Sequence, residues 1–170
     1  PKILWLKNNR PEIYSKTSKI VNGTGFINFK LTGNYTIDHF SAAFMSPLYD
    51  INKQNWSNEL NDGIIELEKL PNLVWTNEIV GKITKSASDA TGLAEGTIVT
   101  SGTIDAAAEA ISVGVIGPKD MMMMYGSTMF YILVTDKILS DKRLWYSPWL
   151  FEGEHSSMAV SYTHLRAHET

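Results

Sequence analysis

Short segments of helical and extended character alternate along this chain, and most of them end at a glycine or a proline. Helices are expected where apolar residues recur with helical spacing, and strands where a short apolar run lies between turn residues. The expected helices are Pro1–Asn9, Pro11–Lys19, Gly25–Leu31, a segment from Trp56 to Leu67, Ser86–Thr91 and Asp105–Val113. The expected strands are Thr36–Asp38, Ile79–Ile83, Thr97–Thr100, Met121–Tyr125 and Met129–Val134. This mixture predicts an α/β or α+β domain.

Local signals predict several of the segment ends. Gly33 and Gly92 each follow a helical stretch and are typical C-terminal stops, because glycine adopts the left-handed conformation without steric cost. Ser57 can cap the helix that follows it, since its hydroxyl can accept a backbone N–H of the first turn. The segment Pro1–Asn9 is apolar on most sides, so we expect much of it to be buried.

The last two expected strands form a β-hairpin around the short polar turn Gly126-Ser127-Thr128. The run of four methionines in the first strand could suggest a metal or redox site. Methionine more commonly fills irregular gaps in a buried strand, and we expect that role here. The five tryptophans could stack on carbohydrate, but they are scattered, so core packing is the expected role for most of them.

Composition excludes several function classes. The chain has 170 residues with 44% hydrophobic and 19% charged content, which indicates a globular domain rather than a disordered one. The net charge of -3 and the lack of a dense basic patch argue against nucleic-acid binding. The chain has no cysteine, which excludes disulfides and thiolate metal sites. Asp38, His39 and Asp50 have a spacing that fits no metal-binding motif, so no metal site is predicted within the chain.

No segment reaches the ~20 apolar residues that a spanning helix needs, and no secretory signal precedes the first segment. These features predict a cytoplasmic protein that does not enter a membrane. The first residue is Pro1 rather than methionine, which is expected if the chain begins inside a longer reading frame.

Six segments, taken in order, carry a family resemblance. They are Lys2–Asn9, Phe26–Gly33 with Asp38, Tyr49–Leu60 with its Trp56-Ser57, Val80-Gly81 with Gly92-Leu93 and Gly96-Thr97, Ser101–Gly114, and Gly126–Thr128. Each is weak alone, but their order and spacing from Pro1 to Ala159 resemble the FGGY carbohydrate kinases, the family of xylulose, glycerol and gluconate kinases. One departure is Gly25, which stands where aspartate is usual.

The resemblance implies an incomplete actin/hexokinase/Hsp70-like ATPase fold, an α/β architecture built on ribonuclease-H-like domains. Residues 1–117 would be the later part of the N-terminal lobe, and 118–159 the start of the C-terminal lobe. The intact parent would use ATP and Mg²⁺ to phosphorylate a small-molecule sugar. Members of the family often form dimers, so a homodimer of the parent is one option.

Asp105 matches the general base of the family, which contacts the sugar and accepts a proton from its hydroxyl. From the residues alone, Asp105 reads instead as a helix N-cap, and the two roles are compatible. Glu109, one turn later, could pair with Asp105, although a solvated glutamate is the simpler reading. Many members carry G-x-G-D-N where this chain has Gly102–Ala106, which leaves the identity of the sugar open.

Gly126, Ser127 and Thr128 match the second phosphate-binding loop of the family, where backbone N–H groups and small hydroxyls hold phosphate oxygens of ATP. The alternative is an ordinary hairpin turn. The loop for the first phosphates and the adenosine site of the family have no counterpart in this chain, so the chain by itself is expected to be inactive. The second hypothesis is a non-catalytic sugar- or nucleotide-binding module of the same fold.

The last residues form a segment apart. Phe151 to Ala159 still resembles the family, whereas Val160 to Thr170 (VSYTHLRAHET) resembles the translation of a transposon-end sequencing adapter. Residues 160–170 are therefore interpreted as a non-native tail, and we expect them to pack on nothing.

Overall fold

The computed structural model describes residues 1–126 and 128–161. The chain divides into two compact units, Pro1–Thr103 and Ile104–Thr170. The predicted lobe boundary at 117/118 stays a prediction, because a division into compact units does not locate the lobes of a longer protein. Among the described residues, no helix combines the length and the apolar character needed to cross a membrane.

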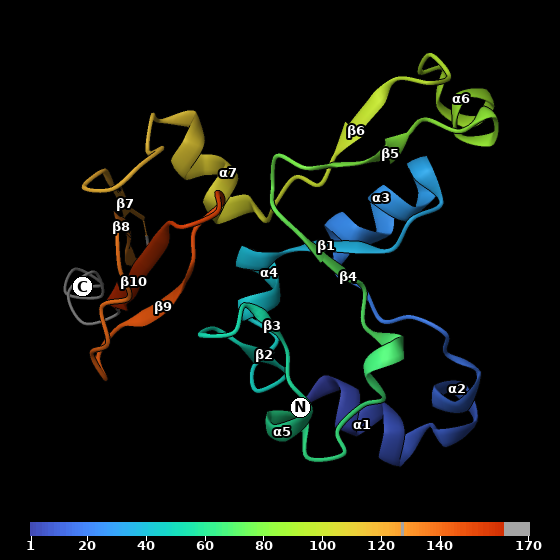
Figure 1. Ribbon diagram of the computed structural model, residues 1–170, viewed down its shortest axis with the longest axis horizontal. Helices are drawn as coiled ribbons and strands as arrows, with labels where there is room; N and C mark the ends of the chain where they lie inside the picture. Colours follow the sequence, from blue (N-terminus) through green and yellow to red (C-terminus); the bar gives the residue numbers. More distant parts are fainter. Residues whose placement is uncertain (127, 162–170) are drawn as a thin grey trace, which may run out of the picture. The chain divides into compact units, whose positions relative to one another are not determined.

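The first unit contains short helices and three small pairs of strands (Figure 1). Its helices are α1 (Lys2–Asn9), α2 (Pro11–Lys16), α3 (Gly23–Thr32), α4 (His39–Ala43), α5 (Asn58–Asn61), the 3₁₀ helix η1 (Leu67–Lys69) and α6 (Lys85–Thr91). Its strands are β1 (Thr36–Asp38), β2 (Tyr49–Asp50), β3 (Asn55–Trp56), β4 (Asn72–Val74), β5 (Ile79–Lys82) and β6 (Ile98–Thr100). The mixture of helices and strands confirms the predicted α/β class.

Strands β1 and β4 run parallel, with Ile37 opposite Leu73 (Figure 1). The pairs β2–β3 and β5–β6 are antiparallel. One core cluster forms around the β1 strand from Ile37, Ala42 and Tyr49, and a second forms from Leu48, Ile65 and Leu70. Strand β1, which ends at Asp38, therefore contributes to one of the two core clusters of this unit.

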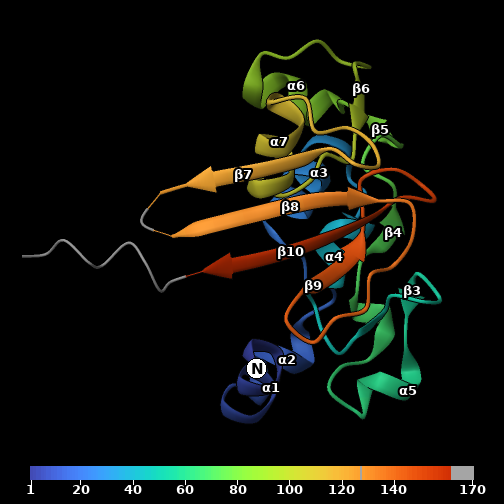
Figure 2. The ribbon, with the colours of Figure 1, turned by 90° about the vertical axis from the view of Figure 1, so that its left-hand side faces the viewer.

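The second unit is one antiparallel sheet with the strand order β7-β8-β10-β9, preceded in sequence by helix α7 (Figure 2). Its strands are β7 (Met121–Tyr125), β8 (Met129–Thr135), β9 (Trp145–Pro148) and β10 (His155–Ser161). The predicted hairpin is confirmed, since β7 and β8 pair with Tyr125 opposite Met129. The indole of Trp149 is fully buried, and its Nε1 donates to the Ile116 carbonyl oxygen at 3.1 Å.

The stop and cap signals are confirmed. Gly33 and Gly92 end α3 and α6 in the left-handed conformation, with φ of 82° and 78°. The Ser57 hydroxyl accepts a hydrogen bond from the Leu60 N–H at 3.2 Å. The predicted helix from Trp56 to Leu67 is wrong beyond its first turn. It ends at Asn61, because Asp62 adopts a left-handed φ of 42° and the Asn61 side chain bonds both backbone groups of Ile65.

Burial departs from expectation in two apolar segments. Helix α1 contains no buried residue, and Trp5 is 58% exposed. In β7 only Met122 is buried, whereas the other three methionines are exposed. Both predictions of burial were wrong, because an apolar sequence indicates a surface able to pack but not whether the described residues cover it. The tryptophans divide likewise: Trp149 is in the core, and Trp145 is 57% exposed.

The predicted non-native tail begins inside a strand. Val160 and Ser161 complete β10 and pair with Phe130 and Met129 of β8. The expectation that the tail packs on nothing is therefore wrong for these two residues, since the edge of β8 that faces away from β7 offers them backbone partners. Residues 162–170 lie outside the described residues.

Gly25 allows α3 to lie against β1. A Cβ atom at this position would sit 2.6 Å from the backbone oxygen of Thr36, so alanine, or the aspartate usual in the family, does not fit without a shift of backbone. Gly23, on the same helix, would have nothing within 4 Å of its Cβ.

We therefore expect Gly25→Ala to lower the free energy of unfolding by about 1–3 kcal/mol, as overpacking of a close contact does. Gly23→Ala is the matched control and should leave the protein unchanged or up to about 1 kcal/mol more stable, because alanine is the better helix former. Urea unfolding measures both. Equal effects of the two substitutions would contradict the close approach of α3 and β1.

Candidate active site

Helix α7 (Asp105–Ser112) carries the predicted base at its first position. Ala107 and Ala110 are buried, while Asp105 and Glu109 are exposed on the remaining surface of the helix. Small buried alanines and polar exposed positions give α7 the amphipathic pattern that fixes which face meets the core. The Asp105 carboxylate therefore points to solvent at the N-terminal end of a helix, where the backbone dipole favours a negative charge.

The interpretation of Asp105 as an N-cap is wrong. The N-cap position is Ile104, which makes no side-chain capping bond, and Asp105 is the first helical residue. Asp105 Oδ1 accepts only the adjacent Ala106 N–H, at 2.8 Å, among the hydrogen bonds of the described residues. Because this bond is local, the carboxylate keeps lone pairs available for a proton or a ligand.

The backbone just before Asp105 is held from several sides. The N–H groups of Ser101 and Gly102 donate to the carbonyl oxygens of Glu78 at 3.0 Å and Thr76 at 3.2 Å. From helix α3, Asn28 Nδ2 donates to the Ser101 carbonyl oxygen at 2.8 Å, and the Thr24 hydroxyl donates to that of Thr103 at 3.2 Å. The stretch from Ser101 to Thr103, here called the approach segment, is thus tied to the core of the first unit.

Asp38 contributes a further bond to the approach segment. Its Oδ2 accepts the Thr103 hydroxyl at 2.9 Å and the Ser41 N–H at 3.1 Å, and its Oδ1 accepts the Ser41 hydroxyl at 2.5 Å. Asp38 is 1% exposed, so burial raises the pKa of its carboxyl, while the hydrogen bonds from Ser41 and Thr103 act in the opposite direction. From the sequence, Asp38 was weighed as a metal ligand. The one other signal was its place in a Thr-Asp pattern that resembles the family, and this did not predict the bond to Thr103.

The other two residues weighed for a metal site have different partners. His39 Nδ1 lies 2.7 Å from the Tyr49 hydroxyl, and the His39 ring packs on Trp75 with centroids 4.3 Å apart. Asp50 Oδ1 accepts the N–H groups of Asn52 and Lys53 in a local turn. Within the described ranges, no group of three His, Asp or Glu side chains is arranged to hold a metal ion.

The predicted phosphate loop is described only at its two ends. The Gly126 N–H donates to the Thr128 carbonyl oxygen at 3.0 Å, which closes the turn between β7 and β8. Ser127 lies outside the described residues. The described residues therefore show the hairpin turn and leave its phosphate-binding role a prediction.

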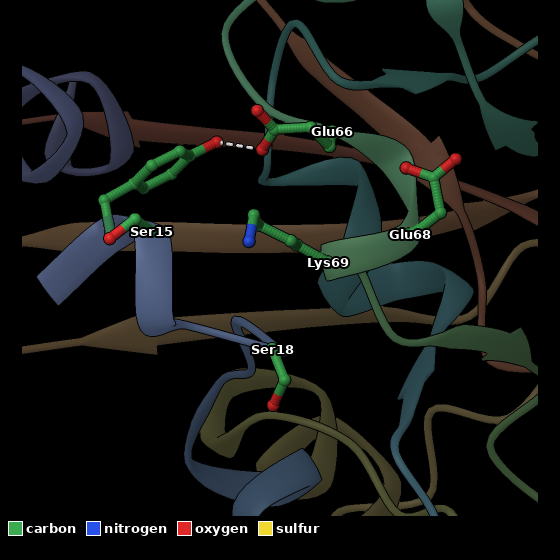
Figure 3. Close-up of a pocket in the computed structure, with 6 residues that line it drawn as sticks. Ser15, Ser18, Glu66, Glu68 and Lys69 are labelled. Carbon is green, nitrogen blue, oxygen red and sulfur yellow. Dashed lines mark hydrogen bonds between the residues drawn. The ribbon is translucent and has the colours of Figure 1, made fainter. Parts of the chain in front are cut away.

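A cavity of about 460 Å³ opens elsewhere in the first unit, between α2 and η1. Its lining includes Tyr14, together with Glu66 and Lys69, which are labelled in Figure 3. The Tyr14 hydroxyl donates to Glu66 Oε2 at 2.5 Å, and the Lys69 ammonium lies 5.2 Å from the centroid of the tyrosine ring. Burial and the bond to Glu66 raise the pKa of Tyr14 to about 12, and the same bond lowers the pKa of Glu66.

Tyr14→Phe should raise the pKa of Glu66 toward its ordinary range, because the substitution removes the donor that stabilises the carboxylate. Since the folded-state pKa of Glu66 is depressed, its contribution to stability is present above the unfolded value of about 4.3 and is lost as pH falls through the folded value. Titration of the Glu66 carboxyl carbon by NMR measures the change. Tyr35→Phe is the control, and an unmoved Glu66 pKa in Tyr14→Phe would contradict the coupling.

Known proteins resemble the chain in sequence and fold. A sequence profile of the FGGY family of carbohydrate kinases, N-terminal domain, matches residues 1–112. The xylulose kinase of Lactococcus lactis is 35% identical over 130 residues, which are 75% of this chain and 26% of the relative. The xylulose kinase of Escherichia coli is 28% identical over 141 residues, 82% of this chain and 29% of the relative.

The crystal structure of xylulose kinase from Rhodospirillum rubrum superposes with a TM-score of 0.86 at 24% identity, covering 94% of this chain and 33% of that one. This likeness confirms that the chain has part of the expected actin/hexokinase-like fold. The chain thus spans about a quarter to a third of the length of the proteins it matches.

Proposed function

Because the chain belongs to the FGGY family of carbohydrate kinases, we propose that it is one part of an ATP-dependent sugar kinase, here called the parent enzyme. The parent enzyme transfers the γ-phosphate of ATP to a hydroxyl of a ketose, a polyol or a sugar acid. A ketopentose is the first candidate, because the relatives from Lactococcus lactis and Escherichia coli are xylulose kinases.

The observation that carries the proposal is the Asp105 carboxylate, exposed at the start of α7 and bonded, among the described residues, only to the Ala106 N–H. In the proposed reaction, Asp105 accepts the proton of the sugar hydroxyl as that oxygen attacks the γ-phosphorus. The bond between the γ-phosphorus and the bridging oxygen breaks, and ADP leaves with the electron pair. Asp105 then holds the proton until solvent removes it.

The remaining parts of the site divide between this chain and the rest of the parent enzyme. Gly126, Ser127 and Thr128 are proposed to hold phosphate oxygens of ATP through backbone N–H groups and hydroxyls. Mg²⁺ would neutralise phosphate charge, but the described residues offer no cluster of ligands for it, so we assign it no step here. The chain alone would therefore be inactive, and the parent enzyme is proposed to be cytoplasmic, with a homodimer as one possible assembly.

The test is ATP turnover by the parent enzyme with a panel of ketoses, polyols and sugar acids, at fixed Mg²⁺. We expect ADP formation to depend on one member of the panel and to be absent for the chain alone. A parent enzyme that binds a sugar or ATP without turnover would overturn the kinase proposal. The departure from G-x-G-D-N at Ile104 and Ala106 would then be evidence for a non-catalytic binding module.

A further inference from the structure

Asp38 makes more bonds than its local role requires. It is the N-cap of α4, and the two bonds from Ser41 complete that cap. Asparagine or serine caps a helix about as well and brings no buried charge. A carboxylate that is 1% exposed is costly unless each of its oxygens is well bonded. Capping alone therefore does not account for the choice of aspartate here.

The hydrogen bond of Asp38 that plays no part in capping α4 is the one from the Thr103 hydroxyl. It joins residues 65 positions apart in sequence and ends two residues before Asp105. The Thr103 carbonyl oxygen also accepts a hydrogen bond, from the Thr24 hydroxyl, so the side-chain hydroxyl and the carbonyl oxygen of Thr103 are both bonded. A residue held at its backbone and at its side chain has little freedom to turn.

We propose that Asp38 and Thr103 form a positioning pair that fixes the approach segment, the stretch of chain that continues directly into Asp105. The inference rests on the proposed role of Asp105 as the base and adds a pair that holds the chain leading into it. Asp38 is a positioning residue, since it reaches Asp105 only through Thr103 and the chain that follows.

The expected magnitude follows from how strictly proton transfer depends on geometry. A displacement of about 1 Å at a reacting group can cost about 100-fold in rate. Asp38→Asn replaces one carboxylate oxygen by an amide nitrogen that donates. Where the amide nitrogen takes the place of Oδ2, the Thr103 hydroxyl and the Ser41 N–H, which share that oxygen, both lose their acceptor. In the parent enzyme we expect kcat to fall about 10- to 100-fold, while KM for ATP stays within about twofold.

A double-mutant cycle separates positioning from general damage. Thr103→Val removes the hydroxyl and should lower kcat by a similar factor, and the Asp38→Asn/Thr103→Val double variant should be no worse than the poorer single variant. Thr103→Ser keeps the hydroxyl and should restore most of kcat. Asp50→Asn is the matched control, because it changes a carboxylate whose bonds are local. If the losses of kcat in the two single variants add up in the double variant, or if Thr103→Ser does not restore kcat, the proposed positioning pair is wrong.

A second readout does not depend on catalysis. Amide hydrogen exchange of Ser101 and Gly102 should become about tenfold faster in Asp38→Asn, which corresponds to the loss of about one hydrogen bond, and should stay unchanged in Asp50→Asn. An inactive wild-type parent enzyme with this exchange pattern would refute the kinase proposal and leave the anchoring of the approach segment intact. Unchanged exchange together with unchanged kcat would refute the positioning pair.

Discussion

Replacing Asp105 by asparagine in the parent enzyme should lower kcat by about 10²- to 10⁴-fold, the range that a positioned general base contributes. The amide keeps the size and the start of α7 but cannot accept the proton of a sugar hydroxyl. KM for ATP should change little, because the proposed base contacts the sugar. Steady-state kinetics over a range of ATP and sugar concentrations separate the two parameters.

Glu109→Gln is the control for this prediction. It makes the same chemical change on the same exposed part of α7, one turn further along, and it should leave kcat within about twofold of wild type. A parent enzyme that keeps its full kcat with Asp105→Asn would show that Asp105 is not the base. Equal losses in both variants would point to a general effect of charge on α7.

The largest expected loss of stability is at Trp149. Its side chain is fully buried, and its Nε1–H donates to the Ile116 carbonyl oxygen, so Trp149→Ala removes both a large packed ring and a hydrogen bond. We expect the free energy of unfolding to fall by about 3–5 kcal/mol. Urea unfolding of the parent enzyme, followed by hydrogen exchange of β8 and β10, measures this loss in the unit concerned.

Two variants show where the effect of Trp149→Ala comes from. Trp149→Phe keeps most of the ring and loses the donor, so it should cost less than the alanine variant. Trp145→Ala, four residues earlier, removes a side chain that is 57% exposed and should stay within about 0.5 kcal/mol of wild type. A loss at Trp145 equal to that at Trp149 would contradict the assignment of the core.

Local structure was predictable from this sequence where a single residue type decides it. Gly33 and Gly92 end their helices because only glycine enters the left-handed region without cost, and Ser57 caps α5 through its own hydroxyl. The β7–β8 hairpin was predicted because a short apolar run between turn residues has few other conformations.

What failed depended on specific side-chain contacts rather than on the spacing of apolar residues. Leu60 to Leu67 has helical spacing, but the helix stops at Asn61, whose side chain bonds the backbone of Ile65 instead. Helix α1 and the methionines of β7 have core-like sequences, yet most of these side chains are exposed. Periodicity records which residues are able to pack, and it does not record what they pack against.

The site divides in the same way. Asp105 was identified by resemblance, and the structure corrected its local role from cap to first helical residue. The bond from Thr103 to Asp38 joins segments 65 residues apart, so no spacing rule could have predicted it. Both residues lie within the segments that carry the resemblance, but the contact between them required the fold.

The most direct test of the central claim is to follow the γ-phosphate of ATP in the parent enzyme. With ATP labelled at the γ-phosphate and a ketopentose, our account predicts labelled sugar phosphate in equal amount to ADP. It also predicts that Asp105→Asn forms sugar phosphate about 10²- to 10⁴-fold more slowly. Label released only as inorganic phosphate, or sugar phosphate formed at the wild-type rate by Asp105→Asn, would contradict it.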